Sequence, residues 1–362
     1  MCSSDLALAR ARVRVLAPDA AAAPLRDGFA DDSGRFDLPA SADCTIEVSL
    51  TGFRTVSAPC GTAADVALTL PLAPVVESVV VTATRTAVPA AQLGVSATAF
   101  SADEIERRGS PFVGQLLQSS PGVALVQTGA PGGISSLFVR GGESNYNLVL
   151  VDGIPLNEPG GTFNFNTLST TNLDRVEIVR GANSAVFGSD AMSSVVQLFT
   201  KRGRTGGPSA SASIEGGSYN TLRAQATASG VARGLDYSVG AARFASDNRG
   251  PNDRFANTSL SANLGGTLGA RTTIRGVLRS ELGRTGTPGQ TAYGRPDLDA
   301  FYDHRDVAAG VSVDQQLTSR LHQRVSYSLS ASHQASTDLI ADPSYTPSRS
   351  EEHTSELQSL AY

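Results

Sequence analysis

Apolar and polar residues alternate with a period of two along the chain from Gly207 onward. In Leu222–Ser229, one Leu and three Ala alternate with Arg, Gln, Thr and Ser, and Leu321–Ala331 repeats this arrangement. Successive side chains of a β-strand point to opposite faces, so the pattern places apolar side chains on one face of a sheet and polar ones on the other. The alternation therefore predicts β-strands over this whole region.

The alternating region divides into about seven strands of roughly nine to eleven residues, the length of a tilted strand that crosses a bilayer. A soluble antiparallel sandwich also alternates, but strands of this length favour a membrane barrel. The predicted strands are Ala210–Glu215, Leu222–Ser229, Leu235–Phe244, Leu260–Leu264, Ile274–Leu282, Val307–Leu317 and Leu321–Ala331.

Short and long connections alternate between these strands. Residues 230–234, 265–271 and 318–320 are short, whereas 246–257 and 283–303 are long, polar and rich in Gly, Pro, Asn or Asp. Periplasmic turns and extracellular loops alternate in this way in outer-membrane barrels. The short connection Gly216–Asn220 is the exception, because the pattern would place it outside.

The composition agrees with a β-rich protein. The 362 residues include 36 Gly, 18 Pro and no Trp, and only 17% are charged. A formal net charge of −5 without a Lys/Arg-rich run argues against a nucleic-acid partner. No apolar run approaches the roughly 18 residues of a membrane helix, so a membrane-embedded form requires a closed barrel. Nucleophile-elbow, zinc-protease, P-loop and Rossmann motifs are absent, so we expect no enzyme.

Residues 85–203 have the pattern of an α+β domain with long Gly- and Asn-rich loops. Ser101-Ala-Asp-Glu104 has capping-box spacing and predicts a helix through Arg107. Further elements are predicted as helices at Val113–Gln118 and Ser184–Phe187 and as strands at Val123–Gln127, Leu137–Arg140, Leu148–Val151, Val176–Arg180 and Val195–Lys201.

Residues 7–72 contain short strands separated by turn residues, which predicts a small, partial β-sandwich. Asp32-Ser-Gly-Arg-Phe-Asp-Leu38 followed by Ser49-Leu-Thr-Gly-Phe53 resembles the carboxypeptidase-regulatory-like domains, which carry no catalytic residues. Cys44 and Cys60 suit a disulfide in an oxidising compartment and, equally, two buried thiols. Their spacing predicts no metal site.

Both ends of the chain resemble translated sequencing-library adapters. Cys2-Ser-Ser-Asp-Leu6 resembles one adapter, and Arg349-Ser-Glu-Glu-His-Thr-Ser-Glu-Leu-Gln-Ser359 resembles its counterpart. We therefore expect residues 1–6 and 349–362 to be adapter-derived and the gene to be cut at both ends. On this interpretation His353 is not a ligand, and a missing signal peptide carries no information.

Several motifs follow one another in a fixed order in the α+β region. They are Phe138-Val-Arg-Gly141, Leu148-Val-Leu-Val-Asp-Gly-Ile-Pro-Leu-Asn157, Val176-Glu-Ile-Val-Arg-Gly181, Ser184-Ala-Val-Phe-Gly-Ser189 and Val195-Val-Gln-Leu-Phe-Thr-Lys201. In this order they resemble the TonB-dependent outer-membrane receptors, within them the vitamin B12 and siderophore receptors. Ser193-Ser194 departs from the pair of glycines usual before the last strand.

The resemblance implies a mixed fold class. We expect the N-terminal β-sandwich, a plug domain at residues 85–203, and at 207–348 the first strands of a truncated antiparallel transmembrane β-barrel. Family members have about 22 strands around a plugged lumen. The implied function is TonB-dependent active transport of a scarce ligand, of the cobalamin or ferric siderophore type, across a Gram-negative outer membrane. A polysaccharide importer of the same superfamily and a β-sandwich surface adhesin are the alternatives.

Residues 73–84 form a predicted linker with a β-prone segment that resembles the TonB box. The resemblance implies that this segment adds as a strand to the edge of TonB, the energy-transducing protein of the periplasm. Backbone hydrogen bonds would supply the affinity, so extendability matters more than side-chain identity. The segment consists of Glu77, Ser78, Val79, Val80, Val81, Thr82 and Ala83.

Two plug loops are the predicted ligand-binding elements, because the resemblance places them at the external apex. Their candidate residues are Gln127, Thr128, Gly129, Gly132 and Gly133 in the first loop, and Asn157, Glu158, Phe163, Asn164 and Asn166 in the second. Predicted structural or gating residues are Arg140, Gly141, Asp152, Gly153, Glu177, Arg180, Gly181 and Gly188.

Buried charges need partners, and the resemblance pairs plug arginines with carboxylates of the barrel wall, whereas Arg175 or Asp174 offers Glu177 a local alternative. No cofactor is expected, although calcium in the Asp- and Asn-rich loop Ser246–Asn257 is an alternative; this loop lacks EF-hand spacing. The expected partners are TonB, a small-molecule ligand and outer-membrane lipid.

Overall fold

In the computed structural model, the chain divides into two compact units, Met1–Ser78 and Val79–Tyr362. The structure describes residues 8–16, 26–39, 44–50, 53, 55–60, 66–71, 80–81, 88–89, 96–129, 132–205, 207–269, 271–318, 321–341 and 344–361. None of the helices in these ranges is long and apolar enough to cross a membrane.

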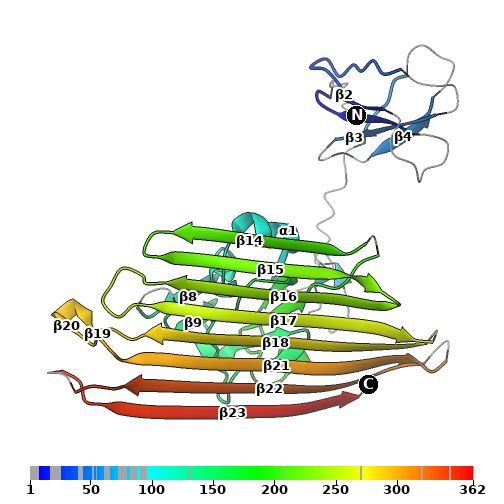
Figure 1. Ribbon diagram of the computed structural model, residues 1–362. Helices are drawn as coiled ribbons and strands as arrows, with labels where there is room; N and C mark the ends of the chain where they lie inside the picture. Colours follow the sequence, from blue (N-terminus) through cyan, green and yellow to red (C-terminus); the bar gives the residue numbers. More distant parts are fainter. Residues whose placement is uncertain are drawn as a thin grey trace. The chain divides into compact units, whose positions relative to one another are not determined.

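The first unit contains one antiparallel sheet in the order β2-β1-β3-β4 (Figure 1). Its strands are β1 (Arg12–Leu16), β2 (Arg26–Phe29), β3 (Thr45–Ser49) and β4 (Val56–Pro59). Alternate residues of the two central strands, such as Val13 and Val48, are buried in a small apolar core. The described strands of the first unit form this one sheet, so the second layer of the predicted sandwich is not among its described residues.

A disulfide closes the core of this unit. Cys44 and Cys60 are bonded, with their Cα atoms 5.1 Å apart, and the Cys60 N–H also donates to the Cys44 carbonyl over 2.8 Å. Of the two alternatives that the cysteine spacing leaves open, the structure has the disulfide.

The second unit begins its described part with a two-stranded pair, β5 (Val80–Val81) and β6 (Val88–Pro89), and continues into the plug region, residues 96–200. A five-stranded sheet in the order β11-β10-β13-β12-β7 forms the centre of the plug region. Only β10 and β13 are parallel. The strands are β7 (Ser96–Ser101), β10 (Asn147–Val151), β11 (Ile154–Pro155), β12 (Leu173–Arg180) and β13 (Ser194–Thr200).

Helices and a hairpin complete the plug region. As the capping box predicts, α1 (Ala102–Arg108) begins where Ser101 Oγ accepts from the Glu104 N–H, and it ends at Gly109 in the left-handed conformation. The sequence does not predict β7, which lies just before it. The remaining elements are α2 (Val113–Leu117), α3 (Ser184–Phe187), the 3-10 helix η2 (Ser144–Tyr146) and the hairpin of β8 (Val123–Gln127) and β9 (Ser135–Val139).

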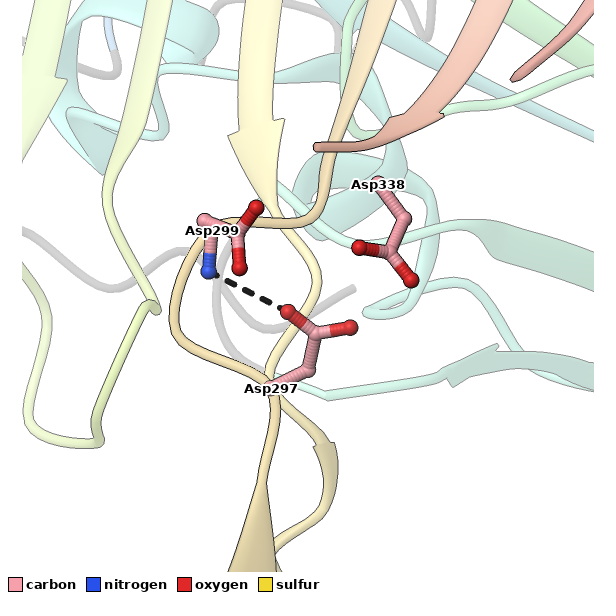
Figure 2. Close-up of side chains that lie close together, drawn as sticks. All are labelled: Asp297, Asp299 and Asp338. Atoms are coloured by element: carbon pink, nitrogen blue, oxygen red, sulfur yellow. Dashed lines mark hydrogen bonds between the residues drawn. The ribbon is translucent and has the colours of Figure 1, made fainter. Parts of the chain in front are cut away.

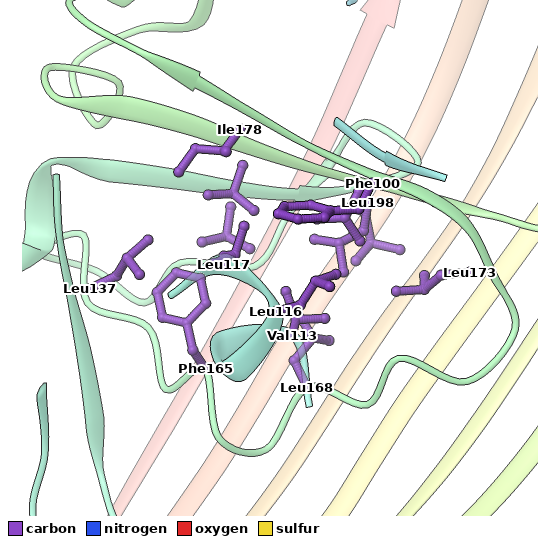
Figure 3. Packing of buried hydrophobic residues seen from close by; sticks show 14 of the residues in the cluster. Phe100, Val113, Leu116, Leu117, Leu137, Phe165, Leu168, Leu173, Ile178 and Leu198 are labelled. Carbon is purple, nitrogen blue, oxygen red and sulfur yellow. The ribbon is translucent and has the colours of Figure 1, made fainter. Parts of the chain in front are cut away.

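The apolar core of the plug region lies between the five-stranded sheet and α2 (Figure 3). Val113, Leu116 and Leu117 of α2 are completely buried against residues such as Ile178 and Leu198 of the sheet. Each such side chain contributes about 1.5–3 kcal/mol when buried. The plug region therefore has a core of its own.

An eight-stranded antiparallel sheet, the wall sheet, runs in simple sequence order from β14 to β23 (Figure 1). It contains all seven predicted strands, but they are longer than predicted, with up to 17 residues. The strands are β14 (Ser209–Gly217), β15 (Thr221–Ala232), β16 (Leu235–Ser246), β17 (Phe255–Leu268), β18 (Thr272–Gly286), β21 (Phe301–Gln316), β22 (His322–Asp338) and β23 (Ser348–Ala361).

The eighth strand, β23, lies in the segment expected to be adapter-derived. It pairs with β22 from Asp338↔Ser348 to Val325↔Ala361. An open sheet edge offers a row of free backbone groups to any extended segment. The adapter origin of residues 349–362 therefore stays a prediction.

The connections of the wall sheet keep the predicted asymmetry. Residues 233–234 form a short turn at one end of the sheet, where only a short connection separates β17 from β18, and 247–254 and 287–300 are longer loops at the other end. The longest loop contains β19 (Gly289–Gln290), the 3-10 helix η3 (Thr291–Tyr293) and β20 (Arg295–Pro296). The short connection 218–220 also lies at the long-loop end.

The alternation seen in the sequence separates the two faces of the wall sheet. The inner face carries hydroxyl, amide and charged groups such as Ser238, Asn257 and Glu281, which contact the plug region. The outer face carries apolar side chains such as Leu264 and Val311, which are 52% and 51% exposed. The plug region therefore lies against the polar face.

Candidate functional site

A buried ion pair on the wall sheet holds the plug segment 167–172. Arg279 and Glu281 of β18 lie 3.1 Å apart with side chains 4% exposed. Glu281 Oε1 accepts from the Ser169 N–H over 3.2 Å, and Arg279 Nη2 donates to the Ser169 carbonyl. The two charges thus neutralise each other and both residues also bind plug backbone, while Glu281 Oε2 accepts from Asn257 and Ser259 of the wall.

Neighbouring wall strands extend these contacts. Asn257 Nδ2 donates to the Thr167 carbonyl over 3.1 Å. Asn172 accepts from Ser238 Oγ over 2.6 Å and donates to Ser261 Oγ over 3.1 Å. Inner-face residues of β16, β17 and β18 therefore fix one plug segment through polar contacts.

At the long-loop end of the wall sheet, the Gly-rich plug loop borders a cavity of about 440 Å³. Four predicted ligand-binding residues line it, namely Thr128, Gly129, Gly132 and Gly133. The opposite side is lined by wall residues, among them Tyr302 and Gln334 with hydroxyl and amide groups and Glu352 of β23 with a carboxylate. We refer to this space as the apex cavity.

Gly132 is the residue that allows the loop to approach the wall. Its φ of +98° is a conformation that residues with a Cβ rarely adopt, and a Cβ there would lie 2.2 Å from the Phe255 ring. Its carbonyl accepts from Thr285 Oγ1 over 3.0 Å. Gly129 also has a positive φ, of +74°, but a Cβ there would meet nothing within 4 Å.

The predicted ligand-binding residue Gln127 lies beside this loop. It joins β8 to the second loop, because its Oε1 accepts from Asn166 Nδ2 over 2.8 Å.

In the second predicted loop, the three asparagines support the plug itself. Asn157 Oδ1 accepts from the Val149 N–H over 2.7 Å, and Asn164 Oδ1 accepts from Ser135 Oγ over 2.8 Å. Asn166, which is 3% exposed, donates to Gly133 as well as to Gln127. These amides fix the shape of the apex.

Glu158 and Phe163 lie at a small crevice between the plug and β21 and β22. Glu158 accepts from Thr162 Oγ1 over 3.2 Å and from Gln334 Nε2 of the wall. Burial raises the pKa of the Glu158 carboxyl, because the charged form is desolvated there. The Phe163 ring meets the Phe165 ring edge-on at 4.9 Å.

Two polar atoms at this crevice have no hydrogen-bond partner among the described residues. They are Asn164 Nδ2 and His304 Nδ1, and His304 as a whole is only 4% exposed. The crevice has about 10 Å³ of space, close to the minimum for a single water. Buried polar atoms are normally satisfied, so these two fit contact with water or a polar ligand group.

The predicted gating residues are placed in tight turns and in the plug sheet. Asp152 has a φ of +50°, and its carboxylate accepts from the Thr200 N–H over 3.1 Å and from Thr200 Oγ1 over 2.5 Å. Burial raises its pKa, and the hydrogen bonds from Thr200 oppose that rise. Five more of the predicted gating residues have a positive φ, namely Arg140, Gly141, Gly153, Gly181 and Gly188.

The expected pairing of plug arginines with wall carboxylates is wrong for Arg180, whereas the local alternative for Glu177 is confirmed. Arg180 donates to Ser96 Oγ over 2.8 Å and to Thr98 Oγ1 over 2.7 Å, because β7 lies beside it in the sheet. Burial lowers its pKa. Glu177 forms the local pair with Arg175, at 2.6 Å. The buried wall pair Arg279–Glu281, which the sequence does not single out, connects wall and plug instead.

A cluster of three carboxylates lies at the long-loop end (Figure 2). Side-chain oxygens of Asp297, Asp299 and Asp338 lie within 4.8 Å of one another. Asp297 Oδ1 accepts from the N–H groups of Asp299 and Ala300 over 3.1 and 2.8 Å, so it shapes the turn. The sequence does not reveal this cluster, because Asp297 and Asp299 lie in the loop before β21, whereas Asp338 lies at the end of β22.

The loop predicted as the calcium alternative uses its acids differently. Asp247 accepts from Asn220 Nδ2 over 2.7 Å and from Arg254 Nε over 2.9 Å, and Asp253 accepts from the Gly250 N–H over 2.8 Å. The hydrogen bond from Asn220 is the main reason that the pKa of Asp247 lies below its usual value.

Of the predicted TonB box, the structure describes Val80 and Val81. They pair antiparallel with Pro89 and Val88 respectively, as β5 and β6. Glu77, Ser78, Val79, Thr82 and Ala83 lie outside the described residues.

Comparisons with known proteins give matches to part of the chain. Residues 89–195 match the family model described as TonB-dependent Receptor Plug Domain. The chain is 37% identical to the vitamin B12 transporter BtuB of Vibrio vulnificus over 124 residues. These residues make up 34% of this chain and 20% of the relative. It is 36% identical to BtuB of Vibrio cholerae over 180 residues, and this alignment covers 49% of this chain and 29% of the relative.

The fold is also similar to solved structures. The ferripyoverdine receptor of the outer membrane of Pseudomonas aeruginosa superposes with a TM-score of 0.63 at 14% identity, over 78% of this chain and 42% of the receptor. At this identity the likeness concerns the fold alone. The chain spans less than a third of the length of the two curated relatives.

Proposed function

Because this chain contains the plug domain of the TonB-dependent receptors, we propose that it belongs to a transporter that imports a scarce ligand, of the cobalamin or ferric siderophore type, across a Gram-negative outer membrane. The observation that carries the proposal is the position of the plug. It lies on the polar face of a sheet whose other face is apolar and exposed.

The outer face of the wall sheet has the dimensions of a bilayer-crossing surface. On β21, Arg305 and Gln315 bound a run of apolar outward residues and are ten positions apart along the strand. At about 3.3 Å per residue this is about 33 Å along the strand. For a strand tilted by about 40°, the height is about 25 Å, which is the height of the apolar band of outer-membrane barrels.

Side chains along neighbouring strands continue this band. Register places Tyr237, Leu264, Gly276, Val311 and Tyr327 in one row on the outer face. Leu264, Val311 and Tyr327 are all more than half exposed. We propose that lipid covers this face and that the wall sheet is part of a closed barrel, since a sheet edge within lipid leaves backbone groups unsatisfied.

The apex cavity is the proposed ligand entrance. It lies at the long-loop end, between the Gly-rich plug loop and the wall. Thr128, Gly129, Gly132 and Gly133 would contact the ligand directly, whereas Asn157, Asn164 and Asn166 hold the loops. Glu158 and Phe163 line the neighbouring crevice, and we propose that a single small polar group of the ligand, or a water that it holds, reaches the unpartnered Nδ1 of His304 there.

Energy coupling is assigned to the segment Glu77–Ala83, which would pair as an extended strand with TonB in the periplasm. The pairing of Val80–Val81 with Val88–Pro89 supports an extended conformation there. The first unit, with its small disulfide-closed sheet, would be a carboxypeptidase-regulatory-like module ahead of the plug.

The direct test is uptake of labelled cobalamin and of a ferric siderophore by cells that depend on this receptor. Val80→Pro removes a backbone donor and should abolish energised uptake while ligand binding at the surface persists. Val80→Thr keeps a β-branched strand residue and should transport normally. Receptor levels in the outer membrane are compared in both variants. Energised uptake by the proline variant at the wild-type rate would exclude the coupling role.

A further inference from the structure

Charged side chains on the outer face of the wall sheet are confined to one end. On the described outward positions of β14–β18, β21 and β22, the charged residues at neutral pH are Arg243, Arg284, Asp303 and Arg305. All four lie near the long-loop end, just above the apolar band. The opposite boundary, with Thr272, Gln315 and Gln323 in one row, is uncharged.

The strand register fixes how the charged residues at the long-loop end are arranged. Arg243 is paired with Thr258, Thr258 with Leu282, and Leu282 with Arg305, so the two arginines lie in one row. Three strand spacings of about 4.8 Å place their backbones about 14 Å apart. Arg284 and Asp303 are opposite each other in the next row toward the long loops.

The arginines of this boundary differ in how they are neutralised. Arg284 binds Asp303 with two hydrogen bonds, of 2.6 and 2.8 Å, and lies over the Phe301 ring at 4.2 Å. Arg243 donates to Thr258 Oγ1 over 2.6 Å, and within the described residues neither Arg243 nor Arg305 forms an ion pair with a carboxylate. Two positive charges are therefore left uncompensated at the edge of an apolar surface.

We infer that Arg243 and Arg305 bind the phosphate headgroups of anionic lipids in the leaflet at the long-loop end. This inference rests on the proposed function, because it requires the wall sheet to lie in a bilayer. At the edge of the apolar band, acyl chains cover residues such as Leu260 and Val307, and the headgroups then lie level with the arginine row. Guanidinium groups bind phosphate through paired N–H donors, so charge and geometry both match this partner.

Native mass spectrometry of the purified receptor, titrated with phosphatidic acid or with phosphatidylcholine of the same chains, tests this inference. Arg243→Gln with Arg305→Gln should weaken phosphatidic acid binding by about fivefold per arginine and leave phosphatidylcholine binding unchanged. The loss should disappear at high salt, where the wild-type preference is itself screened. Arg243→Lys with Arg305→Lys keeps the charge and should retain most of the preference.

The matched control removes two charges from the plug. Arg107 and Arg108 are exposed on α1, and Arg107→Gln with Arg108→Gln should not change lipid binding. Equal affinity of wild type and the Arg243/Arg305 glutamine variant for phosphatidic acid would overturn the inference. Displacement of the lipid by millimolar inorganic phosphate would also overturn it, in favour of a free-anion site.

The experiment distinguishes failure of the headgroup inference from failure of the membrane assignment of the wall sheet. If the receptor binds both lipids without preference, only the headgroup inference fails. If it binds neither lipid and does not partition into phosphatidylcholine vesicles, the membrane assignment of the wall sheet fails with it.

Discussion

Glu281 Oε1, on the wall sheet, accepts a hydrogen bond from the backbone N–H of Ser169, in the plug, over 3.2 Å. Glu281 is 3% exposed and also accepts from Asn257 Nδ2 over 3.1 Å, with Arg279 as its counter-charge. One carboxylate thus joins two parts of the fold that are far apart in the sequence.

Replacing this carboxylate should loosen the plug. Glu281→Gln leaves Arg279 buried without a counter-charge and turns an amide N–H₂ toward existing donors, so we expect a loss of about 3–5 kcal/mol in unfolding free energy. Asp303→Asn is the control, because its pair with Arg284 is on the outer face and should contribute at most about 1 kcal/mol. Thermal unfolding and protease cleavage of the plug measure both. Similar losses in the two variants would argue against the role of Glu281.

The Gly-rich loop gives a matched pair of glycines. Gly132→Ala places a methyl group within 2.2 Å of the Phe255 ring and should displace the loop, with at least a tenfold loss of ligand affinity. Gly129→Ala meets no atom within 4 Å and should cost only the strain of its positive φ, about 1 kcal/mol of stability. Equilibrium binding of labelled cobalamin and of a ferric siderophore separates the two. Equal affinities in both variants would remove Gly132 from the site.

Glu158 should make the plug less stable as the pH rises. Its folded-state pKa is raised by burial, so its contribution is fully present below the unfolded value of about 4.5 and is lost as the pH rises through the folded value. Glu158→Gln is uncharged at all pH values and should show a flatter stability profile. Unfolding midpoints of both proteins between pH 4 and 7 test this; parallel profiles would contradict it.

The disulfide should stabilise the first unit alone. All three cysteines of the chain lie in Met1–Ser78, and Cys44–Cys60 closes a loop across a separation of 16 residues. Cys44→Ser with Cys60→Ser should lower the stability of this unit by about 3 kcal/mol and leave the unfolding of the second unit unchanged. Differential scanning calorimetry resolves the two transitions. A shift of both would show that the units unfold together.

The strands of the wall sheet could be predicted because alternating apolar and polar residues within each strand are enough to identify it. Alternation in Leu222–Ser229 identifies both the strand and its two faces, whereas strand ends are less visible. β22 continues to Asp338 beyond the predicted Ala331, through polar residues on both faces where alternation disappears. β7 is also missed, because Ser-Ala-Thr-Ala-Phe becomes a strand through pairing with β12.

The part of the candidate site that depends on backbone conformation could be predicted from the sequence. The glycines of the first loop can be recognised as places of close approach, and they line the apex cavity. By contrast, Arg279 and Glu281 are two ordinary inward positions of one strand, and their contacts with Ser169 bridge more than 100 residues. Contacts over such separations depend on tertiary structure.

The plug is joined to the wall mainly by hydrogen bonds of hydroxyl, amide, charged and backbone groups, and by Phe112, which packs against Phe244 and Phe255, while most of its buried apolar residues face its own core. Water can replace each of these hydrogen bonds with a similar one, so separating the surfaces costs far less than opening an apolar core of equal area. The buried ion pair remains within the wall during such a separation, because both partners belong to β18. The interface can therefore be wetted and re-formed repeatedly while the plug keeps its fold.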